Sequence, residues 1–434
     1  MSAQPAFAVI GHPLGHSMSP FIHRRLFSLL GVDATYAMQD IAPENLATEL
    51  PALLAKTRGV NVTIPHKQAV IPLMTRLEGR AQIYQSVNTI AVTPDGAVGY
   101  NTDADGFRHA LQEGGAPLSG RVALLGCGGV GRTFACEAAL AGCRIVNAVR
   151  EADREMAAAL RTFVQQLVPE VDYTIVSLDA LQGEFDLLIN ATPVGMYPHN
   201  GAAAVDLRRF SRCEGVLDIV YNPARTALLL QAEELGIPHA GGLSMLVAQA
   251  KRSSEQFTGT AIGDEALARV ERAVNQRLRN IILIGMPGSG KSAVAAALGK
   301  ALDREVVEAD ELIAQRTGMS IPEIFAQSGE ETFRKLETEV LAEQGKRSGI
   351  ILSTGGGCVT RPENYPLLHQ NGTIFRLTRD LAKLPTEGRP ISQTTDLAQL
   401  CARREPLYRR FADVTVSNDG ALEVTVQTIK EALL

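Results

Sequence analysis

Two glycine-rich segments of the 434-residue chain have the spacing of loops that bind phosphate groups. GCGGVG at residues 126–131 follows the apolar run RVALL and has the Gly-x-Gly-x-x-Gly spacing of a dinucleotide loop, whose glycines let the backbone approach a pyrophosphate at a helix N-terminus. GMPGSGKS at residues 285–292 follows NIILI and fits Gly-x-x-x-x-Gly-Lys-Ser. In such a loop the amides surround phosphates, while Lys291 and Ser292 serve the phosphates and Mg²⁺. The sequence therefore predicts a dinucleotide enzyme fused to an ATP enzyme.

The length and the net charge limit the class of protein to which the chain can belong. A chain of 434 residues is too long for one ordinary core and suggests roughly three compact units of about 150 residues each. The hydrophobic content of 45% and the charged content of 21% are typical of globular domains. The net charge of -5 offers no electrostatic footprint for nucleic acid. We therefore expect small-molecule substrates and no nucleic-acid partner.

The cysteines and the apolar runs bear on location. The six cysteines form no Cys-x-x-Cys pair and no dense disulfide pattern, which favours reduced thiols in a cytoplasm. No apolar run reaches the roughly 18 residues of a membrane helix, and the N-terminus lacks the basic and apolar regions of a signal peptide. We expect an untargeted cytoplasmic protein with no membrane partner.

The loops must be placed by strands and helices, whose alternation predicts an α/β fold. Up to about residue 110, apolar strands at residues 7–11 and 59–64 alternate with a helical pattern at residues 21–31. From residue 121 to about 240, the strands RVALLG, CRIVNAV, FDLLINAT and GVLDIVY alternate with helices, one of them closed by Gly142. This second stretch is typical of a parallel, doubly wound sheet.

The rest of the chain repeats the alternation in a different design. Residues 245–259 read as a helix, and residues 264–280 read as a charged, solvated helix that we interpret as a linker. From residue 281 onward, the strands NIILIG, GIILSTGGG and TIFRLT alternate with helices, including a glutamate-rich one at residues 330–345. The two glycine loops differ in design, so internal duplication does not explain them.

The polar segments around the first loop resemble a known family. In order and spacing they are similar to shikimate dehydrogenase over residues 1–262. The segments are GHPLGHSMSPFIH (11–23), GVNVTIPHK (59–67), SVNTI (86–90), GYNTDADG (99–106), NATPVGM (190–196), DIVYNP (218–223) and GGLSMLVAQ (241–249).

The resemblance implies roles for particular residues. Reduction of a ketone by hydride places negative charge on the carbonyl oxygen, so a cation or proton donor must lie beside it. Lys67 matches the family's catalytic lysine, and Asp103 matches the aspartate that orients this lysine and the reacting hydroxyl. The positions that match the family's substrate ligands are Ser17, Ser19, Thr63, Asn88, Tyr221 and Gln249.

The choice of cofactor depends on the residues after the second strand of the dinucleotide domain. An acid there binds the ribose 2′-hydroxyl of NAD, whereas arginine accommodates the 2′-phosphate of NADP. Arg150 and Arg154 match the family's phosphate clamp, and Glu151 stands where an NAD-type acid is expected. We favour NADP(H), because two arginines can engage a dianionic phosphate. The matched cofactor positions are Gly126, Cys127, Gly128, Gly129, Val130, Arg150, Arg154, Ile219 and Gly242.

The segments around the second loop resemble shikimate kinase over about residues 280–434. A glycine loop of this type does not by itself distinguish an ATPase, a GTPase and a metabolite kinase, so the acceptor residues must do so. The matching segments are EADELI (308–313), GEETFRKLE (329–337), STGGG (353–357), GRPI (388–391) and RREPLY (403–408).

This second resemblance also implies roles. Phosphoryl transfer needs alignment and charge stabilisation, which Lys291 and Arg389 would supply at the transferring phosphate. Asp310 would engage the acceptor hydroxyl. Arg334 and Arg404 would bind the acceptor carboxylate, and the backbone of Gly356 would meet a ring hydroxyl. The ATP-binding positions are Gly288, Ser289, Gly290, Lys291, Ser292 and Arg389.

Two features depart from the kinase family. Ser292 would ligate Mg²⁺ directly, but Glu308 stands where the family has an aspartate that supports the metal through water. Between Arg379 and Arg389 the expected lid is shorter and less basic than in the family. Lys383 is the one basic residue between these two arginines. The sequence therefore does not predict which residues contact the adenine or how the lid closes.

The two resemblances imply one architecture. It comprises an α/β substrate domain (1–110 and 241–262), a Rossmann NADP domain (111–240), a helical linker (263–279) and a P-loop kinase domain with a parallel sheet (280–434).

The implied activities are successive. They are NADPH-dependent reduction of 3-dehydroshikimate to shikimate and ATP- and Mg²⁺-dependent phosphorylation of shikimate to 3-phosphoshikimate. One alternative is a quinate-type dehydrogenase fused to another metabolite kinase. A second is a ligand-sensing regulator without turnover, against which stands the presence of Lys67, Asp103, Lys291 and Asp310.

Overall fold

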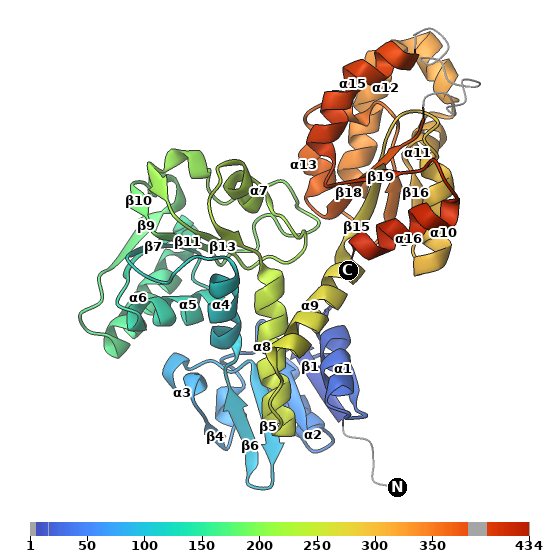
Figure 1. Cartoon of the computed structure of the whole chain (residues 1–434). Coiled ribbons are helices and arrows are strands. Elements are labelled where there is room, and N and C mark those ends of the chain that lie inside the picture. The colour runs from blue at the N-terminus through green and yellow to red at the C-terminus, as the bar shows by residue number, and fades with distance from the viewer. Residues whose placement is uncertain (1–5, 16, 381–396, 434) are drawn as a thin grey trace. The chain divides into compact units, whose positions relative to one another are not determined.

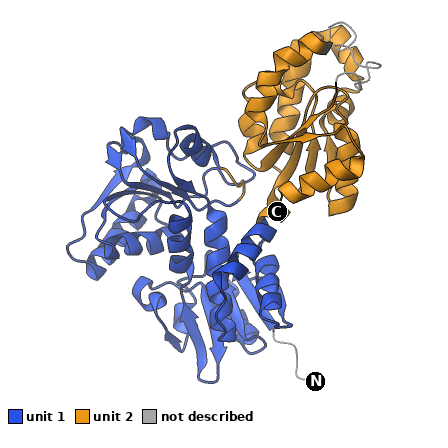
Figure 2. Cartoon of the chain, in the orientation of Figure 1, with its two compact units in different colours: residues 1–221, 226–274 blue, residues 222–225, 275–434 orange. Residues whose placement is uncertain are grey.

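The structure of the chain is a computed structural model that describes residues 6–15, 17–380 and 397–433. It consists of two compact units (Figure 2). Unit 1 comprises residues 1–221 and 226–274, and unit 2 comprises residues 222–225 and 275–434. Figure 1 labels their helices and strands, and each unit is described by itself below.

The first sheet of unit 1 gathers four of the predicted functional segments at one edge. Its order is β2 (Thr35–Asp40), β1 (Ala6–Gly11), β3 (Gly59–Val62), β5 (Thr89–Thr93), β6 (Gly96–Tyr100) and β4 (Arg76–Leu77). Strands β1 and β3 are parallel and end at the same edge. Strand β5 is antiparallel to β3 and begins there, and β6, antiparallel to β5, ends there. The segments with Ser17, Lys67, Asn88 and Asp103 follow or precede these strand ends, so the topology brings them together.

Helices from two distant parts of the chain surround this sheet. They are α1 (Ser19–Leu29), α2 (Leu46–Leu54), α3 (Arg80–Tyr84), α4 (Asp103–Glu113) and α8 (Gly242–Thr258). The ring of Phe257 on α8 stacks on Phe7 of β1 with centroids 5.0 Å apart. Helix α8 therefore returns from the far side of the sequence to pack against the first sheet, and it carries Gln249 with it.

The second sheet of unit 1 is parallel and doubly wound. Its order is β14 (His239–Ala240), β13 (Val216–Asp218), β11 (Leu187–Asn190), β7 (Arg121–Leu125), β8 (Arg144–Val149) and β9 (Tyr173–Ser177). Buried residues of α5 (Gly129–Leu140) and α6 (Arg154–Leu167) pack in the core on one face, and those of α7 (Ala227–Glu234) pack in the core on the other. A short pair, β10 (Glu184–Phe185) and β12 (Arg212–Cys213), lies beside it. The predicted Rossmann fold is confirmed.

Helix α9 (Asp264–Leu278) is less solvated than its charged sequence indicates. Leu267, Val270 and Val274 are buried, and Glu271 lies 3.2 Å from the Nε2 atom of His109 on α4. The helix thus packs one apolar face within unit 1, a burial that the many charged residues of its sequence concealed.

Unit 2 contains a parallel sheet of five strands among the described residues. Its order is β16 (Val306–Glu308), β17 (Ile351–Ser353), β15 (Asn280–Ile284), β18 (Gly372–Thr378) and β19 (Val414–Ser417). One face carries α10 (Lys291–Leu302) and α16 (Leu422–Ala432). The other carries α11 (Ala309–Thr317), α12 (Ile321–Gln344), α13 (Asn364–His369) and α15 (Leu397–Phe411).

Helix α12 is broken at Gly329, where φ is +78°. The break starts the glutamate-rich helix at the place that the sequence predicted. The glycine loop lies between central strand β15 and α10, as a P-loop domain requires.

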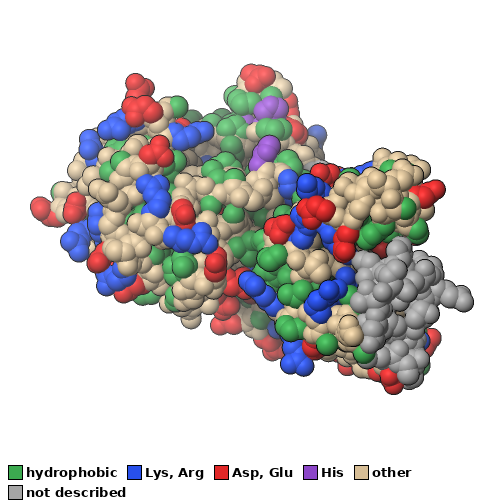
Figure 3. Space-filling view, turned by 90° about the horizontal axis from the view of Figure 1, so that it is seen from above, with side chains coloured by type: hydrophobic (Ala, Val, Ile, Leu, Met, Phe, Trp, Pro, Cys, Tyr) green, Lys and Arg blue, Asp and Glu red, His purple; other side chains and the backbone are tan. Residues whose placement is uncertain are grey.

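Three properties of the surface and the thiols complete the description. No helix within the described ranges is long and apolar enough to cross a membrane. Acidic and basic side chains are interspersed over the face drawn in Figure 3. All six cysteines are free thiols.

Candidate active sites

The centre of the first site is a buried ion pair. Lys67 Nζ donates to Asp103 Oδ2 at 2.6 Å, and the two side chains are 11% and 7% exposed. Lys67 follows β3, whereas Asp103 is the first residue of α4, where the helix dipole favours a carboxylate. The pair lies beside the dinucleotide loop, because a β-carbon at Gly129 would be 3.9 Å from Cδ of Lys67. The Lys67 ammonium is thus held next to the glycine loop at the N-terminus of α5.

Two further predicted residues join this pair. The side-chain amide of Asn88 donates to Asp103 Oδ1 at 2.9 Å, and its oxygen accepts from the backbone of Thr102 at 2.8 Å. Gln249 Oε1 lies 3.5 Å from the same Asn88 nitrogen. Each carboxylate oxygen of Asp103 therefore accepts a hydrogen bond from a fixed donor, and the structure brings Lys67, Asn88, Asp103 and Gln249 together.

The predicted carboxylate-binding serines lie at the start of α1. Ser17 Oγ accepts from the backbone nitrogen of Ser19 at 3.2 Å, and both residues are half-buried. The side chain of Ser19 is a hydrogen-bond partner of the buried Tyr36 hydroxyl, which donates to Asn61 at 2.7 Å. Thr63, also half-buried, follows β3 and holds its methyl group against Gly11. Sequence reasoning did not identify Tyr36 or Asn61.

A cavity of about 460 Å³ lies at the carboxyl ends of β7 and β11. Doubly wound sheets bind nucleotides at such a place, because neighbouring connections leave on opposite faces. The predicted residues that line it are Gly126, Cys127, Gly128, Gly129, Val130, Arg150, Ile219 and Tyr221. Gly242 and Arg154 do not line it. A β-carbon at Gly242 would lie 1.9 Å from the carbonyl oxygen of Ile219, so Gly242 allows the close approach of α8 to that strand end.

The proposed phosphate clamp is already paired with acids. Arg150 donates to Asp153 through Nε at 2.6 Å and Nη2 at 3.2 Å, and Asp153 also lines the cavity. Arg154 lies 3.5 Å from Glu151, whose side chain is 81% exposed. The acid nearest the cavity is therefore Asp153 and not Glu151. The spacing of three residues between Arg150 and Asp153 was a signal in the sequence, but it was overlooked.

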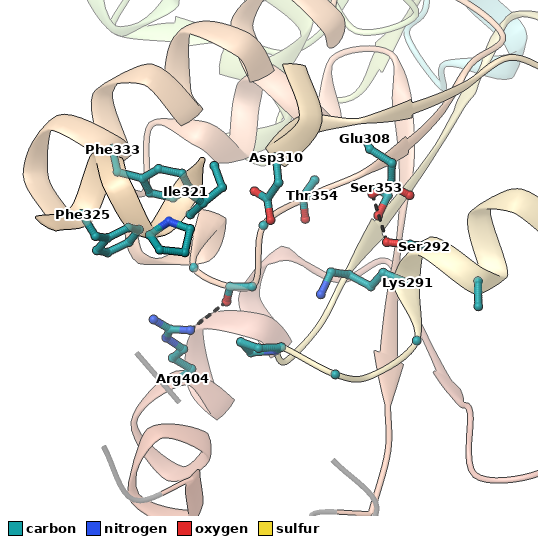
Figure 4. A pocket seen from close by; sticks show the side chains of 18 of the residues that line it. Lys291, Ser292, Glu308, Asp310, Ile321, Phe325, Phe333, Ser353, Thr354 and Arg404 are labelled. Atoms are coloured by element: carbon teal, nitrogen blue, oxygen red, sulfur yellow. Dashed lines mark hydrogen bonds between the residues drawn. The ribbon is translucent and has the colours of Figure 1, made fainter. Parts of the chain in front are cut away.

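The second site is a cavity of about 490 Å³ in unit 2 (Figure 4). It joins the glycine loop to the acceptor residues that were predicted from segments far apart in the sequence. The predicted residues that line it are Gly288, Gly290, Lys291, Ser292, Glu308, Asp310, Arg334, Gly356 and Arg404. Ser289 is buried outside this lining. Arg389, Lys383 and the expected lid lie outside the described residues.

The end of this cavity next to the glycine loop has a hydrogen-bond donor that could bind phosphate and oxygen groups that could bind Mg²⁺. Lys291 is 8% exposed, and its Nζ donates to the carbonyl oxygens of Gly285 at 3.0 Å and Met286 at 3.2 Å. Ser292 Oγ donates to Glu308 Oε2 at 3.1 Å. The longer Glu308 side chain thus reaches the serine that would ligate Mg²⁺, and burial raises its pKa. Two hard oxygen groups next to a phosphate site fit Mg²⁺.

Asp310 lines the cavity. Figure 4 shows Asp310, Lys291 and Arg404 around the same space. Burial raises the pKa of Asp310, and the positive charges of Lys291 and Arg334 oppose that shift. A carboxylate in this environment accepts a proton more readily than one in water, which suits a base for a hydroxyl.

Hydrogen bonds hold both of the arginines that were predicted to bind the acceptor. Arg334 is 5% exposed and pairs with the fully buried Glu337 at 2.6 Å. A β-carbon at Gly357 would lie 2.0 Å from Nη2 of Arg334, so a glycine is needed for the guanidinium to pass. Arg404 Nη1 donates to the carbonyl oxygen of Gly356 at 3.0 Å. Glu337 was missed from the sequence, although it follows Arg334 at helical spacing.

Comparisons with known proteins agree with this geometry. The family model described as shikimate dehydrogenase substrate binding domain matches residues 9–90. The family model described as shikimate kinase matches residues 287–434.

Relatives of known name cover unit 1. "Shikimate dehydrogenase (NADP(+))" of Shouchella clausii is 35% identical over 274 residues, which are 61% of this chain and 97% of the relative. That of Citrifermentans bemidjiense is 37% identical over 281 residues, 62% of this chain and 94% of the relative. The crystal structure of Thermus thermophilus shikimate 5-dehydrogenase with NADP(H) and shikimate is 31% identical with a TM-score of 0.54, and covers 62% of this chain and 99% of its own.

Proposed function

The chain belongs to the shikimate dehydrogenase family, and with its shikimate kinase domain we propose that it catalyses two successive steps of the shikimate pathway. Unit 1 reduces 3-dehydroshikimate to shikimate with NADPH, and unit 2 phosphorylates shikimate to 3-phosphoshikimate with ATP and Mg²⁺. The observation that carries the proposal is the second cavity. It is lined by the second glycine loop, the carboxylate of Asp310 and the guanidinium groups of Arg334 and Arg404, which supports the binding of a small hydroxylated acid next to ATP.

In the first reaction, this chain's residues hold the substrate and supply a proton. NADPH supplies the hydride when it is bound. As the carbonyl carbon accepts the hydride, negative charge develops on the oxygen, and the Lys67 ammonium donates a proton to it. Asp103 holds that ammonium at 2.6 Å, and Asn88 holds Asp103. Ser17 and Ser19 bind the substrate carboxylate, and Thr63, Tyr221 and Gln249 bind its hydroxyl groups.

In the second reaction, the acceptor is fixed while charge is neutralised. Arg334 and Arg404 bind the carboxylate of shikimate, and each charge-assisted contact contributes about 1.5–3 kcal/mol. Asp310 accepts the proton of the attacking hydroxyl, whose oxygen forms the new bond to phosphorus as the bond to ADP breaks. Lys291 meets the charge on the transferring phosphate, and Ser292 and Glu308 bind Mg²⁺. The resemblance to shikimate kinase gives Arg389, which lies outside the described residues, the same role as Lys291.

The cofactor, the boundaries and the location belong to the same proposal. We propose a preference for NADPH, since Arg150 faces the cavity, although Asp153 weakens that preference. The first enzyme ends near residue 262 and the second begins near residue 280. Free thiols and soluble substrates favour a cytoplasmic location.

One experiment tests both steps. The full chain is given 3-dehydroshikimate, NADPH and ATP with Mg²⁺, and the products are identified by mass spectrometry and NMR. Shikimate should form without ATP, and 3-phosphoshikimate should form when ATP is added.

Two matched variants assign each step to its unit. Lys67→Met should abolish reduction while added shikimate is still phosphorylated. Lys291→Met should abolish phosphorylation while 3-dehydroshikimate is still reduced. Faster turnover of 3-dehydroquinate than of 3-dehydroshikimate would support the quinate-type alternative, and no turnover of either would contradict the proposal.

A further inference from the structure

A buried carboxylate on the dinucleotide-binding helix has no part in the chemistry described above. Glu137 lies on α5, whose N-terminal end is the glycine loop, and it is 3% exposed. An ionised carboxylate so far from water is expensive unless charged donors surround it. Such donors are present, and they come from two other helices.

Three side chains converge on this carboxylate. Arg80 Nη1 lies 2.7 Å from Oε1, and the hydroxyl of the buried Tyr84 donates to the same oxygen. Arg108 donates to Oε2 through Nε at 2.7 Å and Nη2 at 2.6 Å. Arg80 and Tyr84 belong to α3, and Arg108 belongs to α4. One carboxylate thus ties α5 to α3 and α4 by direct hydrogen bonds.

Each of these helices leads directly to a part of the hydride site. Helix α4 begins with Asp103. Helix α3 ends at Tyr84, shortly before Val87, whose backbone nitrogen donates to the carbonyl oxygen of Lys67 at 2.7 Å. Helix α5 begins at Gly129, beside the Lys67 side chain.

A second tie runs between α5 and α3. Arg132 Nε donates to the carbonyl oxygen of Tyr84 at 2.6 Å. Helix α3 is therefore bonded to α5 at two positions of α5, Arg132 and Glu137. Helix α4 is bonded to α5 through Arg108. The loop that binds the dinucleotide and the pair that protonates the substrate are joined by rigid elements through this cluster.

The cluster around Glu137 matters more for the relative position of α3, α4 and α5 than for the stability of the unit. Apolar helix contacts tolerate small slides, whereas a carboxylate with several charged donors requires one arrangement. Hydride transfer depends on reacting atoms about 3–3.5 Å apart, and a displacement of about 1 Å lowers the rate roughly 100-fold. We propose that Glu137 is a positioning residue that fixes the dinucleotide loop relative to Lys67 and Asp103, an inference that rests on the proposed reduction.

The test is Glu137→Gln in the full chain, which keeps the shape and removes the charge. We expect kcat for reduction to fall by roughly 10- to 100-fold, while NADPH and shikimate, each titrated alone, bind with nearly the parent's affinity. With NADPH deuterated at the transferred position, the isotope effect on kcat should increase, because hydride transfer becomes slower than product release. Phosphorylation of shikimate by the same preparation should be unchanged.

A matched control separates position from stability. Asp186→Asn removes a carboxylate of the same unit, between β10 and β11, that accepts from the backbone of Arg121 at 2.6 Å and pairs with Arg212. It should lower the melting temperature without changing kcat or the isotope effect. Arg108→Gln, which weakens the tie while Arg80 still pairs with Glu137, should give a smaller fall in kcat in the same direction.

Three outcomes decide the matter. A parent-like kcat and isotope effect in a folded Glu137→Gln variant would overturn the inference while the proposed function stands. Equal losses in Glu137→Gln and Asp186→Asn at equal melting temperatures would assign Glu137 a structural role only. A parent chain that does not reduce 3-dehydroshikimate would overturn both proposals.

Discussion

Replacing Lys67 and Asp103 singly and together separates the structural role of the ion pair from its chemical role. The perturbations are Lys67→Met, Asp103→Asn and the double variant. Because the two atoms are 2.6 Å apart and the side chains are 11% and 7% exposed, each single change leaves the other group buried without its main partner. Removing one member of a buried pair costs about 3–5 kcal/mol, whereas replacing both is nearly neutral.

The expected magnitudes differ between stability and activity. For a unit of this size each kcal/mol moves the melting temperature by about 2–4 °C, so each single variant should lose roughly 6–20 °C. The double variant should regain most of that loss. Reduction should fall by about 10²- to 10⁴-fold in Lys67→Met, since the proton donor is gone, and the double variant should regain none of it.

The assay uses calorimetry of the full chain together with both enzyme activities. Kinase turnover by the same sample reports the amount of intact protein, so a loss of reduction alone is specific to unit 1. Stability losses that simply add in the double variant would refute the strong coupling of the pair. Near-parent reduction by a folded Lys67→Met variant would remove the lysine from the mechanism.

Asp153→Asn should raise the preference for NADPH over NADH by up to about fivefold, because it frees Arg150 from an exposed ion pair; a lower ratio of the two kcat/KM values would count against this. Arg404→Ala should raise the KM for shikimate about tenfold or more without changing the KM for ATP, and equal changes in both would place Arg404 away from the acceptor. Burial raises the pKa of Asp218 from 3.8 to about 6. The folded state therefore holds the proton more tightly than the unfolded chain, and protonation adds stability as pH falls through about 6. The melting temperature of the parent should thus rise relative to that of Asp218→Asn between about pH 7 and pH 5, and a constant difference would contradict the shift.

Local sequence was sufficient to identify both phosphate loops and most strands and helices around them. The reason is that glycine spacing, the apolar strand before each loop and the helix after it involve residues close together in the chain. The same holds for the helix that starts at residue 330, where Gly329 breaks α12. The Rossmann and P-loop folds follow from these short-range patterns.

Tertiary structure alone decided which charged groups meet. Lys67, Asn88 and Asp103 come together because β5 and β6 reverse direction in the sheet, and strand direction is not written in any single segment. Sequence reasoning took α9 for a solvated linker helix, but packing buries one of its faces, since its partner surface lies elsewhere in the chain.

The acidic partners of the predicted site residues also depend on the tertiary structure. The sequence matched Arg150 to a phosphate clamp and Arg334 to an acceptor site. The spacing of three residues to Asp153 and Glu337 permits an ion pair in each case, but the tertiary structure decides that these pairs form. The tie from Glu137 to α3 and α4 joins residues far apart in the chain. Side-chain types and spacing determine which chemistry is available, whereas burial and distance, which depend on the packing of distant elements, determine which charges are free to perform it.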